Sequence, residues 1–193
     1  MTGAVLRKAR ESAAVKEEFF AAEAPRVAAL AERMAAAFGG GARLWVMGNG
    51  GSATDAQHVA VEFFHPIVEK RRPLPAAALV SDPALLTAIA NDRDFAKVFA
   101  DQLAVLARPG DMALAISTSG KSPNLVQALE AARRLELLTI AFTGKDGGRF
   151  PALADHCFVV PSFSIHRIQE THVALYHILW DCVHVALGED DVL

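Results

Sequence analysis

The stretch from residue 113 to residue 124, ALAISTSGKSPN, constrains the fold more than any other, because an apolar run passes through a hydroxyl-rich loop directly into a helix. The run is apolar without polar alternation, which is typical of a parallel strand that is buried on both faces. Ser122 is a good N-cap and Pro123 fits the first helical position. The stretch therefore predicts a strand–loop–helix unit of a parallel α/β sheet.

The loop of this unit is suited to binding an anion. A helix start leaves backbone N–H groups without partners and carries the positive end of the helix dipole. The hydroxyls of Ser117, Thr118, Ser119 and Ser122 would add hydrogen-bond donors around Gly120. An ordinary turn accounts for any one of these residues, but four hydroxyls in six positions favour a phosphate site.

The same loop is close to a nucleotide-binding motif. Residues 115–122, AISTSGKS, almost match G-x-x-x-x-G-K-[ST]. Ala115 stands where the first glycine of that motif is needed, and three loop residues carry hydroxyls. We therefore disfavour a nucleotide site, which would require nucleotide binding that is lost on Lys121→Ala.

Similar apolar runs and helical patterns alternate along the rest of the chain. We expect strands at 43–47, 75–80, 112–116, 137–142 and 156–160. We expect one or two helices over 5–38, with Pro25 beginning the second, and further helices at 53–64, 83–90, 94–107, 123–135 and 165–187. This order predicts a Rossmann-like α/β fold: a doubly wound, five-stranded parallel sheet flanked by helices, with an N-terminal helical segment.

The chain length suits a single domain. At 193 residues, with 52% apolar and 21% charged residues, the chain can bury a substantial core and is not expected to be disordered. We expect one domain over 1–193, in which residues 1–40 form helices for packing or oligomerisation and residues 41–188 form the α/β core.

Charge and cysteine content restrict the partners. The net charge of −3 gives no general attraction to nucleic acid or to an anionic membrane, so neither is expected as a partner. The N-terminus lacks the apolar core of a signal peptide, and no window of about twenty residues is free of charge. Cys157 and Cys182 fit a reducing compartment. We expect a cytoplasmic protein.

A second glycine-rich turn, GNGGSA at 48–53, formally matches the dinucleotide fingerprint G-x-G-x-x-A. The match is weak, because the next strand ends near Ser81 and Asp82, well beyond the twenty residues expected for the acidic partner. A tight turn that approaches another ligand explains the glycines equally well. Both glycine-rich loops should lie at the carboxyl edge of the sheet, where such folds bind ligands.

Two groups of side chains suggest chemistry. His58 and Glu62 are four residues apart, so they share one face of a helix, where they could hold a metal or orient one another. A solvated pair is the alternative. The last helix carries His172, His177 and His184 among apolar residues, and spacing alone cannot choose a functional one.

Five motifs occur in an order that resembles the phosphoheptose isomerases of the sugar isomerase (SIS) domain family, from about residue 43 to the last helix. They are GNGGSxxDAQHxxxE at 48–62, TAIAND at 87–92, ISTSGKSPN at 116–124, TGKDGG at 143–148 and RIQExH at 167–172. The resemblance implies isomerisation of sedoheptulose 7-phosphate to D-glycero-D-manno-heptose 7-phosphate through an enediol, in a homotetramer that binds one zinc ion per subunit.

The resemblance also implies roles for individual residues. The metal ligands would be His58, Glu62, Gln169 and His177. Glu62 would be the general base and His177 the partner acid or base. The substrate contacts would be Asn49, Gly50, Gly51, Ser52, Glu62, Asn91, Asp92 and Gln169, with the phosphate loop formed by Ser117, Thr118, Ser119 and Ser122.

The chemistry asks for these residue types, because moving a proton between C1 and C2 needs a carboxylate poised over the carbon. If Glu62 also binds zinc, its basicity falls and the ion would serve mainly to order the site. The eight residues from Gln169 to His177 span roughly 12 Å of helix. A kink or a ligand from a neighbouring subunit would close that gap, so we expect the site at or near a subunit interface.

Two features depart from the family pattern. His166 stands where an acidic residue is common, which puts substrate orientation and pH dependence in question. The loop HPIVEKRRP at 65–73 is also unlike the family, and we favour a solvated face over a second contact to an acidic ligand.

Two non-enzymatic functions compete with the isomerase. One is a regulator that uses the same fold to bind a replication initiator, and the other is a sensor that binds a phosphosugar without converting it. The presence of all four expected metal and base residues favours the enzyme over the regulator, but it separates the enzyme from the sensor only weakly.

Overall fold

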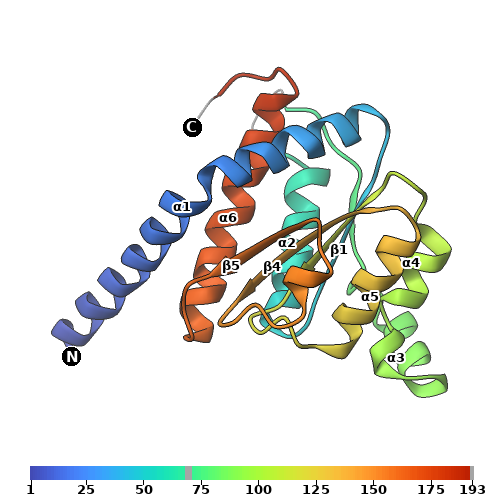
Figure 1. Ribbon diagram of the computed structural model, residues 1–193, viewed down its shortest axis with the longest axis horizontal. Coiled ribbons are helices and arrows are strands. Elements are labelled where there is room, and N and C mark those ends of the chain that lie inside the picture. Colours follow the sequence, from blue (N-terminus) through green and yellow to red (C-terminus); the bar gives the residue numbers. More distant parts are fainter. Residues whose placement is uncertain (68–70, 192–193) are drawn as a thin grey trace.

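A computed structural model describes residues 1–67 and 71–191, and its centre is a five-stranded parallel sheet (Figure 1). The strands are β1 Leu44–Gly48, β2 Ala76–Ala78, β3 Met112–Ile116, β4 Leu138–Gly144 and β5 His156–Val160. The helices are α1 Thr2–Gly39, α2 Gly51–Phe64, α3 Pro83–Asp92, α4 Ala100–Leu106, α5 Pro123–Arg134 and α6 Ile165–Ala186. Two short 3₁₀ helices, η1 Phe95–Lys97 and η2 Phe150–Ala152, complete the order.

The strand order β2-β1-β3-β4-β5 places the topological switch between β1 and β3. From β1 the chain first adds β2 on one side and then returns to add β3 on the other. Gly48 lies opposite Ile116, so the turns that follow β1 and β3 leave the sheet side by side. Ligands of open α/β sheets bind at such a point.

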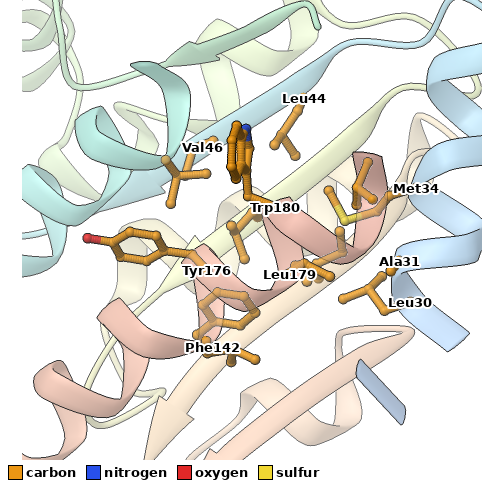
Figure 2. Close-up of a cluster of buried hydrophobic side chains, with 14 of the residues drawn as sticks. Leu30, Ala31, Met34, Leu44, Val46, Phe142, Tyr176, Leu179 and Trp180 are labelled. Atoms are coloured by element: carbon orange, nitrogen blue, oxygen red, sulfur yellow. The ribbon is translucent and has the colours of Figure 1, made fainter. Parts of the chain in front are cut away.

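Helices cover both faces of the sheet, as predicted. One core lies beneath α1, α2 and α6 and includes Met34, Phe142 and Leu179 (Figure 2). The other lies beneath η1, α4 and α5, and Phe99 and Leu129 belong to it. Since successive strand residues point to opposite faces, an unbroken apolar strand serves both cores. The doubly wound fold is therefore confirmed.

The N-terminal segment is one helix, so the two-helix alternative is wrong. Pro25 lies inside α1. It removes one backbone donor, but the helix buries Phe19 before the proline and Leu30 and Met34 after it, which holds both sides in place. The first half of α1 is largely exposed and projects beyond the rest of the molecule (Figure 1).

Helix boundaries near the ligand edge also differ from expectation. α2 begins at Gly51 instead of residue 53, and α3 continues to Asp92 instead of ending at residue 90. The helix expected over 94–107 is divided into η1 and α4. Asp94 caps η1 by accepting a hydrogen bond from the Ala96 N–H, and this turn buries Val98 before α4 begins.

The described part of the chain holds no helix both long and apolar enough to cross a membrane. Cys157 is buried and Cys182 is partly buried, and both are free thiols. Part of the 65–73 loop lies outside the described residues, so its expected role stays a prediction.

One buried histidine makes the stability of the fold depend on pH. His172 is fully buried and its Nε2 lies 3.1 Å from the Thr143 carbonyl oxygen, which can only accept, so Nε2 carries the proton of a neutral ring. Burial lowers the pKa of His172 to about 4. The histidine of the unfolded chain therefore becomes protonated near pH 6.5, whereas that of the folded chain stays neutral until about pH 4. The stability that depends on this group falls as the pH drops between these two values.

We expect this effect to contribute about 2 kcal/mol between pH 7 and pH 5. Burial raises the pKa of Asp55 to about 6, which acts in the opposite direction over part of that range. Urea unfolding at both pH values should therefore compare the natural chain with His172→Gln, in which the Asp55 contribution cancels. An equal pH dependence of the two proteins would disprove the effect.

Candidate active site

The two glycine-rich loops are joined by a pair of asparagine side chains. Asn49 Nδ2 donates to Asn124 Oδ1 and Asn124 Nδ2 donates to Asn49 Oδ1, both at 2.9 Å. Asn124 is buried, and its Oδ1 also accepts from the Leu125 N–H at the start of α5. The loops after β1 and β3 therefore form one continuous surface. Gly50, with φ 55, turns the chain into α2, and Ser52 is buried in the first turn of that helix.

Two of the predicted phosphate-binding hydroxyls hold the loop itself. Ser117 is buried, and its Oγ accepts from the backbone N–H of Ser119 at 3.4 Å and of Gly120 at 3.2 Å. Ser119 Oγ accepts from the Lys121 N–H at 3.4 Å. These bonds close the loop into a fixed turn before α5.

The other two hydroxyls take no part in holding the loop, whereas the Ser117 and Ser119 oxygens accept from it and keep only their O–H groups to donate. Thr118 and Ser122 are half-buried, and neither hydroxyl has a protein partner within residues 1–67 and 71–191. Ser122 occupies the N-cap position of α5 as predicted, but its side chain forms no capping hydrogen bond. An anion at this helix start would therefore meet two free hydroxyls and the positive end of the helix dipole.

The lysine of this loop pairs with an acidic residue and does not extend toward a nucleotide phosphate. Lys121 Nζ lies 2.8 Å from Asp146 Oδ2 in the loop after β4. The hydrogen bond from Lys121 lowers the pKa of the exposed Asp146 carboxyl. A lysine held in an ion pair is not directed at phosphates of a nucleotide, which agrees with the missing first glycine of the motif.

Helices α2 and α6 lie side by side and run in the same direction. The Tyr176 hydroxyl hydrogen-bonds to His58, and the Trp180 indole N–H donates to the Glu62 carbonyl oxygen at 2.8 Å. The residues of both pairs are 118 positions apart in the sequence, as expected for two helices that run in parallel. The same offset brings Gln169 against Gly51, where an added Cβ would lie 2.3 Å from Gln169 Nε2. A larger residue at position 51 would require the end of the glutamine side chain to move.

Three of the expected metal ligands converge midway along these helices. His58 Nε2 lies 3.0 Å from Glu62 Oε1 and 3.4 Å from His177 Nε2. The ligand atoms of the three residues all lie within 4.8 Å of one another. Two imidazole nitrogens and a carboxylate oxygen are a donor set that zinc prefers, so the residues present fit a zinc ion.

The surroundings favour the uncharged form of His177. Partial burial lowers the pKa of His177, and the neighbouring His58 lowers it further. A neutral imidazole is the form that ligates a metal or accepts a proton. Nearby, one oxygen of Asp55 is buried without a partner among the described residues. Burial, together with the charges of Asp55 and Glu62, raises the pKa of Tyr176.

The single chain does not bring every predicted residue to this cluster. α6 is one helix from Ile165 to Ala186, so Gln169 stays two turns from His177, roughly 12 Å along the axis. Asn91 and Asp92 lie exposed at the end of α3, where the Asn91 side chain donates a hydrogen bond to Asp92 Oδ1.

Sequence reasoning did not identify two residues of the site. Asn124 follows Pro123 in the quoted motif, and a polar residue at the start of α5 was a usable signal. Tyr176, whose hydroxyl lies 2.8 Å from His58 Nδ1, could not be found from spacing, because the contact joins two helices that are far apart in the sequence.

Comparisons with known proteins identify the family of the chain. The model of the family described as SIS domain matches residues 9–144. The phosphoheptose isomerase of Thermodesulfovibrio yellowstonii is 45% identical over 185 residues, which is 95% of this chain and 92% of that protein. The phosphoheptose isomerase of Desulfovibrio desulfuricans is 48% identical over 182 residues, 94% of this chain and 87% of that protein.

Solved structures show the same relationship. The phosphoheptose isomerase of Neisseria gonorrhoeae superposes with a TM-score of 0.88 at 37% identity and covers 94% of this chain and 97% of its own. That of Francisella tularensis gives a TM-score of 0.91 at 35% identity and covers 95% and 98%. The chain therefore belongs to the SIS domain family and, within it, to the phosphoheptose isomerases.

Proposed function

We propose that this chain converts sedoheptulose 7-phosphate to D-glycero-D-manno-heptose 7-phosphate through an enediol. The observation that carries the proposal is the convergence of His58, Glu62 and His177 on one point, in a phosphoheptose isomerase chain whose hydroxyl-rich loop begins α5 on the other face of the sheet. An aldose–ketose exchange needs a base, an acid and an anchor for the phosphate, and these two groups contain all three.

Each residue has a definite task in this reaction. The free hydroxyls of Thr118 and Ser122 would hold the phosphate at the start of α5. The Glu62 carboxylate would remove the proton from one carbon and return it to the next, and the neutral His177 ring would exchange a proton with the substrate oxygens. In the absence of a cation, His58 holds Glu62 in place through the 3.0 Å contact of its Nε2 with Glu62 Oε1.

A zinc ion belongs to the proposal as well. His58, Glu62 and His177 would hold it, and when bound it would supply positive charge that stabilises the enediol oxygens. Gln169 of a second copy could add a fourth ligand to the two imidazoles and the carboxylate.

A homotetramer in the cytoplasm completes the proposal. None of the residues of α3 is buried within the chain, and the apolar side chain of Leu85 is exposed on it. The exposed first half of α1 offers a second surface. Assembly through these surfaces would cover apolar side chains and bring residues of another copy to the open cluster.

A turnover assay tests the proposal. Purified chain, stripped of metal and then supplied with one equivalent of zinc, should form the aldose from sedoheptulose 7-phosphate, as followed by NMR. Unphosphorylated sedoheptulose should react far more slowly, because it lacks the anchor. Tight binding of the phosphosugar without turnover, with zinc present, would refute the isomerase and support a binding protein instead.

A further inference from the structure

The hydroxyl of Tyr176 has one protein partner in the described chain, and that partner belongs to the proposed metal site. Its oxygen lies 2.8 Å from His58 Nδ1, the ring nitrogen that faces away from Glu62 and His177. The Tyr176 ring is buried at the edge of the core beneath α1, α2 and α6, and its hydroxyl points away from the neighbouring apolar side chains (Figure 2). Packing therefore holds the ring in place, while the hydroxyl forms a hydrogen bond with His58.

A hydroxyl suits His58 in either of its neutral forms. With Glu62 ionised, His58 Nε2 carries the proton and donates to Glu62, so Nδ1 accepts from the Tyr176 O–H. A cation at Nε2 requires the other form, in which Nδ1 carries the proton. Tyr176 then accepts from Nδ1, because a hydroxyl can both donate and accept.

In the second form the tyrosine proton needs a new acceptor. Asp55 lies one turn before His58 on α2, and its Oδ2 is buried without a partner among the described residues. In metal sites, a hydrogen bond to the second ring nitrogen commonly fixes the orientation of a ligating histidine, and the Tyr176 hydroxyl makes that contact with His58 Nδ1.

We propose that Tyr176 is a positioning residue, whose hydroxyl fixes the orientation of the His58 ring so that Nε2 is presented to a divalent cation. The inference rests on the metal site of the proposed function but not on the reaction. A purely structural tyrosine would be replaced without loss by phenylalanine, which fills the same space.

Zinc affinity measured by chelator competition on the full chain tests this role. Tyr176→Phe should weaken zinc binding by roughly 10–100-fold, the usual effect of losing the partner of a ligating histidine. Thr171→Val is the matched control, because Thr171 lies on the same helix and its buried hydroxyl donates to the Arg167 carbonyl oxygen, away from the cluster. It should change stability and leave zinc affinity within twofold.

A double-mutant cycle shows whether Tyr176 acts through His58. In a His58→Ala background, Tyr176→Phe should cause no further loss of zinc affinity. Tyr176 is also the one tyrosine of the chain, so fluorotyrosine labelling gives a single ¹⁹F resonance. That resonance should shift when zinc is added to the natural chain and stay unchanged in His58→Ala.

Three results would overturn the inference: zinc affinity of Tyr176→Phe within twofold of the natural chain, an undiminished effect in the His58→Ala background, or no zinc binding by the natural chain. Failure of the isomerase proposal has a different signature. A chain that binds zinc with the expected dependence on Tyr176, yet does not convert the heptose phosphate, would refute the reaction and leave this inference standing.

Discussion

Replacing Glu62 by glutamine should lower kcat for the heptose phosphate by roughly 10²–10⁴-fold, the usual contribution of a general base. The amide keeps the size of the side chain, so the helix and its packing should persist. It cannot accept the carbon-bound proton, and no other carboxylate belongs to the ligand cluster in the described part of the chain. Steady-state kinetics with zinc supplied measures the change.

The zinc content of Glu62→Gln separates the two roles proposed for this residue. If zinc stays bound while kcat falls, the carboxylate acts on the substrate. If zinc is lost and excess zinc restores the rate, the carboxylate is mainly a ligand and the assignment as base is wrong. Glu32→Gln, at an exposed position on α1, is the matched control and should leave both quantities unchanged.

The strands at the centre of the sheet could be predicted because burial on both faces leaves an uninterrupted apolar pattern. The predicted bounds of β3 and β5, 112–116 and 156–160, agree with the structure. The helix predicted over 94–107 is confirmed for residues 100–106, but its first part was wrong because packing, which buries Val98 and Phe99 at the turn into α4, overrides local helix propensity. The possible helix break at Pro25 is absent for the same reason, because tertiary contacts hold α1 together on both sides of the proline.

The candidate site could be predicted only where its residues share an element. The spacing of His58 and Glu62 places them on one face of α2 without any knowledge of the fold. The positions of His177 and Tyr176 beside His58 depend on how α6 lies along α2, which no local pattern encodes. The resemblance to the family supplied His177. It did not supply Tyr176.

Gln169 shows the limit of a single chain. The residue fills the space left by Gly51 at the start of α2, two helical turns from the other expected ligands. Whether it reaches a metal depends on the arrangement of subunits, and the physical reason lies in the rigid 1.5 Å rise per residue of an unbroken helix. The sequence therefore predicted that an interface completes the site, and this stays a prediction.

Replacing Gly120 by alanine should destabilise the fold by about 2–4 kcal/mol and raise KM for the phosphosugar. Gly120 has φ 61, and an added Cβ would lie 2.0 Å from the Gly147 carbonyl oxygen. The loop after β4 is tied to this point, since the Arg149 N–H donates to the Gly120 carbonyl oxygen at 2.9 Å. Alanine would therefore separate two backbones and displace the hydroxyls that are proposed to hold the phosphate.

Gly110→Ala isolates the steric part of this effect. Gly110 has φ 88, but an added Cβ there meets nothing within 4 Å, so the substitution carries only the cost of a left-handed backbone, on the order of 1 kcal/mol. Urea unfolding should place Gly120→Ala well below Gly110→Ala in stability, and KM should rise only for Gly120→Ala, because only that loop lies in the proposed site. Equal stabilities of the two variants would show that the loop after β4 can move away from the added Cβ at little energetic cost. An unchanged KM in Gly120→Ala would show that the phosphate is anchored elsewhere, since a loop pushed off its support cannot keep its hydroxyls in place.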